Sequence, residues 1–137
     1  MKKIKIISVV LLIAAFISLL TACGNKASSV SEDQQQKYTA LAEKVIDDLN
    51  KNKLDSILVI STDEMKNVLS KDKFAEVYKA IESNGAFKEF EKSEVETIEQ
   101  DNCSFIVVIE KVKYEKKSLT YTISFDKDDK LAGLYFK

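Results

Sequence analysis

The feature that most constrains this fold is a change of hydrophobic period at Asn84-Gly85. Before this point, apolar residues recur every three or four positions, which is typical of amphipathic helices. After it, they alternate with polar residues or form β-branched runs, which is typical of strands. Asn84-Gly85 itself suits a helix end, because glycine readily adopts the left-handed conformation that closes a helix. The sequence therefore predicts an α+β chain, with helices first and strands afterwards.

Four helical segments are expected before Gly85. The first has an apolar face formed by Tyr38, Leu41, Ala42, Val45 and Leu49. The capping-box pattern from Ser31 to Gln34 leaves open a start near Glu32. Leu54 to Ile60 keeps helical spacing, although periodicity alone also allows a strand. Ser61, paired with Glu64, and Ser70 are the expected N-caps of the last two helices.

Four strands are expected after Gly85. They cover Phe87 to Glu99, the doubly apolar run Cys103 to Ile109, the alternating segment Ser118 to Phe125, and Leu131 to Phe136. Asp101-Asn102 and residues 126–130 supply turn chemistry between them. Because no long crossover separates the strands, they are expected to form a four-stranded antiparallel curved sheet. The N-terminal helices should pack on one face of this sheet.

The first 22 residues are typical of a secretory signal peptide. Lys2, Lys3 and Lys5 precede an apolar run of 15 residues from Ile6 to Leu20. A membrane-spanning helix needs about 20 apolar residues, whereas a shorter run behind a basic start favours a cleaved signal. An uncleaved anchor helix is the alternative interpretation.

Leu20-Thr21-Ala22-Cys23 resembles the bacterial lipobox. The resemblance implies cleavage between Ala22 and Cys23 and a lipid on the Cys23 thiol, with acyl chains such as palmitate. Two or more chains hold a protein stably at a membrane, whereas one is marginal. The expected location is therefore the extracytoplasmic face of the cell membrane; a plain signal peptide with a chance cysteine is the alternative.

The chain is thus expected to divide into a signal peptide (1–22), a lipidated cysteine with a flexible tether (23–36) and one α+β domain (37–137). Without Lys2, Lys3 and Lys5, the 21 basic residues fall to 18 against 22 acidic ones, and the net charge changes from -1 to -4. Cys103 then has no partner for an intramolecular disulfide and is expected to be a small buried side chain.

Composition argues against most site chemistries. The chain has 0 histidines, and all of its basic residues are lysine. Imidazole bases, His-ligated metals and guanidinium forks are therefore excluded. Asp126, Asp128 and Asp129 do not form a calcium loop, because Lys130 and Leu131 stand where an oxygen ligand and a glycine are required. We expect no metal, no cofactor, no nucleic-acid partner and no catalytic activity.

Four segments carry a family resemblance. They are Asp47–Lys51, Thr62–Lys66, Asn84–Phe87 and the closing stretch Phe125–Leu134. The chain from Ala42 to Phe136 is similar to domains of unknown function in Gram-positive lipoproteins, which are sometimes found ahead of an α/β-hydrolase domain. The element order also resembles NTF2-like and cystatin-like folds. The resemblance implies a fold and no chemistry, and Asp129 stands where a turn glycine is common.

Aromatic residues are the candidate lining of a ligand pocket on the sheet. They are Phe87, Phe90, Phe105, Tyr121, Phe125 and Tyr135. Core packing is the alternative role for the same side chains. The expected function is that of a non-catalytic, membrane-anchored lipoprotein that binds a small apolar ligand, a peptide or an envelope protein. A hydrolase-associated or weakly hydrolytic domain is the alternative, and the oligomeric state stays open.

Overall fold

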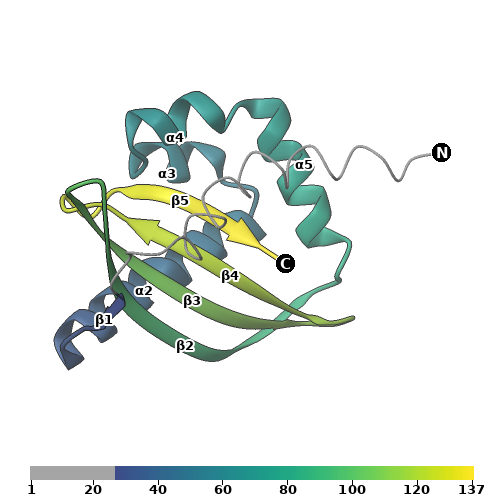
Figure 1. Ribbon diagram of the computed structural model, residues 1–137. Coiled ribbons are helices and arrows are strands. Elements are labelled where there is room, and N and C mark those ends of the chain that lie inside the picture. Colours follow the sequence, from purple (N-terminus) through teal and green to yellow (C-terminus); the bar gives the residue numbers. More distant parts are fainter. Residues whose placement is uncertain (1–26) are drawn as a thin grey trace.

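The computed structural model describes residues 27–137, which form an α+β fold (Figure 1). The helices are α2 (Glu32–Asn50), α3 (Leu54–Val59), α4 (Asp63–Val68) and α5 (Lys71–Glu82). The strands are β1 (Ala27–Ser29), β2 (Phe87–Gln100), β3 (Cys103–Tyr114), β4 (Ser118–Phe125) and β5 (Leu131–Phe136). Within this range, no helix is both long and apolar enough to cross a membrane. The expected signal peptide and Cys23 lie outside the described residues.

The sheet has five antiparallel strands in the order β1-β2-β3-β4-β5, so the prediction of four strands is wrong. The additional strand is β1, in which Ala27 pairs with Ile98 and Ser29 pairs with Glu96. Three small residues carry no hydrophobic period, and the edge of β2 supplies their pairing partner. Periodicity therefore gave no signal for this strand.

Helix α2 begins at Glu32, before the expected domain start at residue 37. The Ser31 side chain accepts a hydrogen bond from the Gln34 backbone N–H, and the Ser31 backbone N–H donates to Gln34 Oε1. This capping box satisfies two helix-end donors and starts the helix ahead of its apolar face. The described part of the expected tether (23–36) therefore contains β1 and the first turn of α2.

The core lies between the sheet and the helices. Its fully buried members include Ala42, Val45, Ile46, Leu49, Val108, Val112, Tyr121, Ile123 and Phe125. In Figure 1, α2 crosses one face of the sheet, while α3 and α4 lie beside β5. Ser61, between α3 and α4, forms a parallel bridge to Leu131. The inner face of the sheet is consequently filled by side chains along most of β3 and β4.

The cap of α4 differs from the expected one. Thr62, and not Ser61, accepts a hydrogen bond from the Met65 backbone N–H. The bridge to Leu131 draws Ser61 into the sheet edge, where it is buried and its hydroxyl donates to the Ile57 carbonyl. Tertiary pairing therefore moves the cap by one residue.

Cys103 is exposed, which corrects the expectation of a buried side chain. Asp101 and Asn102 join Gln100 to Cys103, with positive φ angles of 50° and 62°. Two positive φ angles in a two-residue loop are typical of a type I′ hairpin turn. Cys103 sits beside this exposed tip, so the apolar character of the rest of β3 does not bury it.

The turn between β4 and β5 is tied to helix α2. Asp129 has a φ of 60°, the left-handed conformation that a glycine would favour. Its carboxylate accepts hydrogen bonds from Lys37 Nζ and the Tyr38 hydroxyl, each at 2.5 Å. These hydrogen bonds lower the pKa of Asp129, and the bond from Lys37 has the largest effect. Burial, followed by the interaction with the Asp129 carboxylate, raises the pKa of Tyr38 to about 12. Asp129 therefore adopts a backbone conformation that glycine would adopt more easily, and its carboxylate connects the turn to helix α2.

Candidate binding cleft

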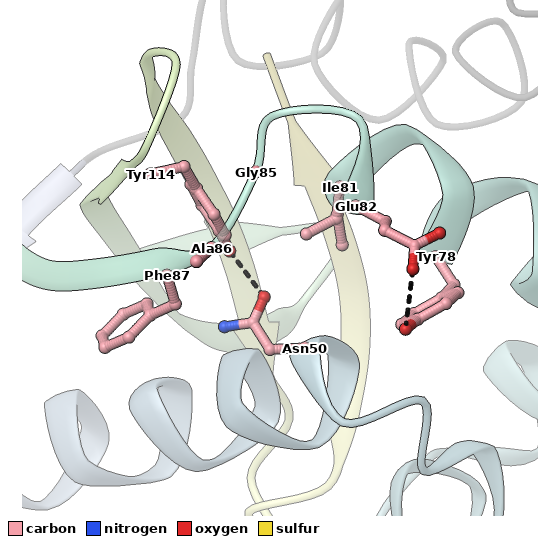
Figure 2. Close-up of a pocket in the computed structure, with 8 residues that line it drawn as sticks. All are labelled: Asn50, Tyr78, Ile81, Glu82, Gly85, Ala86, Phe87 and Tyr114. Atoms are coloured by element: carbon pink, nitrogen blue, oxygen red, sulfur yellow. Dashed lines mark hydrogen bonds between the residues drawn. The ribbon is translucent and has the colours of Figure 1, made fainter.

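A cleft of about 190 Å³ opens where α2 ends, α5 ends and β2 begins (Figure 2). Its lining residues are Asn50, Tyr78, Ile81, Glu82, Gly85, Ala86, Phe87 and Tyr114. Pockets for drug-sized ligands are usually about 300 to 1,000 Å³. This cleft therefore suits a single side chain or a small ligand group.

Hydrogen bonds fix the rear of the cleft. The Tyr114 hydroxyl donates to Asn50 Oδ1 at 2.8 Å and lies 2.7 Å from the Tyr121 hydroxyl. Because Asn50 receives the Tyr114 proton, Tyr121 is the donor to Tyr114. Burial raises the pKa of both tyrosines, which keeps both hydroxyls protonated. The chain of three side chains holds the end of α2 against the sheet.

An aromatic group forms one side of the cleft. Phe87 is 40% exposed, which is unusual for a large apolar side chain in this protein. Its ring centroid lies 5.0 Å from that of Phe90 and 6.2 Å from that of Tyr114, the latter edge-on at 83°. These contacts hold the Phe87 ring in place while leaving part of it open to solvent.

Helix α5 supplies the opposite side. Tyr78 and Glu82 lie one helical turn apart, and the Tyr78 hydroxyl donates to Glu82 Oε1 at 3.4 Å. In Figure 2 this pair faces across the hollow from Phe87, with Asn50 and Ile81 between them. The described lining residues include one carboxylate and no lysine.

The connection from α5 to β2 closes the top of the cleft. Gly85 has a φ of 84°, and a Cβ placed on it would lie 2.7 Å from Glu115 Cβ. The Ala86 backbone N–H donates to Glu115 Oε2 at 3.3 Å, and the Glu115 N–H donates to the Ala86 carbonyl at 2.9 Å. Glycine is required here both by conformation and by this close approach.

A family model matches residues 42–134, a range that includes every lining residue of the cleft. Its description is "Protein of unknown function (DUF3887)". The chain belongs to this family. The description assigns no activity to the DUF3887 domain.

Among solved structures, one similar to this DUF3887 chain is an NMR structure of a protein from Ruminococcus gnavus ATCC 29149. The TM-score is 0.66 with 24% sequence identity, over 77% of this chain and 90% of that chain. The similarity supports the α+β fold and carries no functional assignment. No curated protein shows a significant match.

We predict that Gly85→Ala destabilises the DUF3887 domain by about 1 to 3 kcal/mol, the usual range for a residue held in a disfavoured backbone conformation. The added Cβ meets both the positive φ and the Glu115 side chain. Urea unfolding monitored by circular dichroism measures the loss. Gly133→Ala is the matched control, because its φ is not positive; an equal loss in both variants would contradict the prediction.

The six aromatic residues expected to line a pocket occupy three environments. Phe87 lines the cleft, and Phe90 stacks on it. Tyr121 and Phe125 are fully buried in the core. Phe105 and Tyr135 lie on the other face of the sheet, because they alternate with inward-facing neighbours. The described residues therefore do not form a single pocket lined by all six.

Sequence reasoning missed the rest of the cleft. Asn50, Tyr114 and the helical pair Tyr78 and Glu82 come from three separate elements, so no single spacing connects them. One usable signal was present: Asn50 and the stretch Asn84–Phe87 both belong to segments that carry the family resemblance. The structure brings these two segments together.

Glu110 is a second unusual group, beneath α2 and not in the cleft. It is 1% exposed, and its Oε2 atom has no hydrogen-bond partner in the described part of the chain. Burial is the main cause that raises the pKa of this carboxyl to about 7. A hydrogen bond from Ser93 lowers the pKa, and repulsion from Glu43 raises it further. Such a group can hold a proton at neutral pH, and its burial makes stability depend on pH.

Proposed function

We propose that the protein is an extracytoplasmic lipoprotein, cleaved after Ala22 and lipidated on Cys23, whose domain binds a small ligand group without catalysis. The observation that carries the binding role is the cleft between α5 and β2, with a partly exposed Phe87 held by its aromatic neighbours. The anchor rests on the basic start, the apolar run and the lipobox-like residues 20–23.

We also propose that the domain is NTF2-like or cystatin-like and comes from a Gram-positive envelope. Its support is the long helix α2 against an antiparallel sheet and the resemblance of the sequence to lipoprotein domains. Tyr121 and Phe125 fill the inner face of this sheet. A ligand site is therefore expected at the end of the sheet, where Phe87 and Tyr114 leave the cleft open.

Replacement of Cys23 by alanine tests the anchor. We expect the variant to leave the membrane fraction or to be mislocalised, because the lipid acceptor is gone. Fractionation and immunoblotting of cells measure the change, with Cys103→Ala as the matched control. If Cys23→Ala remains in the membrane fraction with unchanged mobility, the lipoprotein assignment is wrong.

The binding role is tested with a panel of small apolar, aromatic and peptide probes. Saturation-transfer NMR on the full chain in nonionic detergent should detect binding that Phe87→Ala weakens. Val68→Ala is the control, since Val68 is comparably exposed at 42% and lies on α4, outside the cleft. Turnover of an ester or peptide substrate that one serine or carboxylate substitution abolishes would favour a hydrolytic domain instead.

A further inference from the structure

We propose that the cleft selects an alkylammonium group, carried by a free amine or by the lysine side chain of a peptide. This inference rests on the proposed binding function and adds the chemical class of the ligand. The cleft is too small for most complete drug-sized ligands, but its volume of about 190 Å³ suits one alkyl chain with a charged end.

The first support is that the described lining residues include no positively charged side chain. The chain has 21 lysines, yet none is among the described residues that line the cleft. Glu82 contributes a carboxylate at one wall and is exposed. A ligand cation would therefore meet negative charge in the cleft with no cationic lining residue to repel it.

The second support is that this negative charge is not neutralised. Glu89, Glu91 and Glu94 on β2 all have lysine partners within 4.0 Å. Glu82 and Glu115 form no ion pair among residues 27–137, as is also true of exposed carboxylates outside the cleft such as Glu76 and Glu99. Glu115 Oε2 contacts the Ala86 N–H at the top of the cleft. Two unpaired carboxylates thus lie beside one small opening.

The third support is the aromatic character of the walls. Phe87, Tyr78 and Tyr114 all line the cleft; because Tyr114 is 2% exposed, Phe87 and Tyr78 supply the accessible rings, and aromatic faces attract cations through their quadrupole. A neutral alkyl group would gain from contact with the rings but not from the carboxylates. An alkylammonium uses both features, with its methylenes against the rings and its charge near Glu82.

The test compares two probes of similar shape, Nα-acetyl-lysine methylamide, which keeps its side-chain ammonium, and Nα-acetyl-norleucine methylamide. The free amine is n-butylamine. Saturation-transfer NMR titration of the full chain in nonionic detergent should show tighter binding of the lysine probe than of the norleucine probe. Glu82→Gln should weaken lysine-probe binding about two- to five-fold and leave norleucine-probe binding unchanged. Glu76→Gln, an exposed site on the same helix, should change neither.

A second variant separates π interaction from apolar contact. Phe87→Leu keeps apolar bulk and removes the ring, so it should weaken the lysine probe more than the norleucine probe. Butylamine binding as tight as that of the lysine probe supports a free amine, and a clear preference for the lysine probe supports a peptide. Equal affinity for the lysine and norleucine probes overturns the ammonium inference alone. Failure of every probe to bind overturns the proposed binding function as well.

Discussion

Replacing Phe125 with alanine is expected to lower the free energy of unfolding by about 3 to 5 kcal/mol, the usual cost of removing a buried phenylalanine side chain. Phe125 is 0% exposed, and its ring centroid lies 5.8 Å from that of Tyr38. It ends β4, where it pairs with Ile106 on one side and Leu131 on the other. Urea unfolding followed by circular dichroism measures the loss, because the chain has 0 tryptophans for fluorescence.

Phe87→Ala is the matched control for this core substitution. The same atoms are removed, but Phe87 is 40% exposed, so we expect a loss of about 1 kcal/mol or less. A loss below about 0.5 kcal/mol in Phe125→Ala would mean that β4 presents its other face to the helices.

The faces of β4 were predictable because strand alternation is a local property. Leu119, Tyr121, Ile123 and Phe125 were expected on one face, and all four are buried in the core. The positive φ of Asp129 was foreseeable from the family resemblance, since aspartate stands at a turn position where glycine is common in the family. In both cases the determining neighbours lie within a few residues along the chain.

The cleft was not predictable, because it depends on contacts between distant segments. Asn50 ends α2, Tyr78 lies on α5 and Tyr114 ends β3, yet hydrogen bonds and packing place them around one opening. Strand β1 has the same origin, because the edge of β2 supplies its pairing partner. The exposure of Cys103 has a local cause instead, because the adjacent Asp101-Asn102 turn places Cys103 beside a hairpin tip. Hydrophobic period contains no information about either feature.

Glu110 lies beyond the expected strand Cys103 to Ile109, and the longer β3 of the structure places it in an inward-facing series. Ile106, Val108, Val112 and Tyr114 alternate with it toward the core. In the structure Ser93 lies opposite Glu110 on β2, and the Ser93 hydroxyl is 2.9 Å from Thr39 Oγ1 on α2. The carboxyl group is therefore enclosed between the helix and the sheet, with two hydroxyls nearby.

Burial of this carboxyl makes stability depend on pH in a defined direction. The pKa of Glu110 is about 7 in the folded chain, against an ordinary value of 4.5. Between these values the unfolded chain releases the proton while the folded chain keeps it, so stability falls as pH rises from about 4.5 to 7. Below pH 4.5 both states are protonated and the penalty is absent. Above pH 7 the full penalty is on the order of 3 kcal/mol.

Glu110→Gln should therefore stabilise the protein by up to about 3 kcal/mol at pH 8 and have little effect at pH 4, because glutamine is neutral at both. Urea unfolding of wild type and variant across this pH range measures the difference in their free energies of unfolding. Contributions from other acids such as Asp129 are common to both proteins and cancel in this difference. Glu99→Gln, an exposed site on β2, should show no such pH-dependent gain. A gain for Glu110→Gln that is the same at pH 4 and pH 8 would show that the folded carboxyl does not titrate near neutrality.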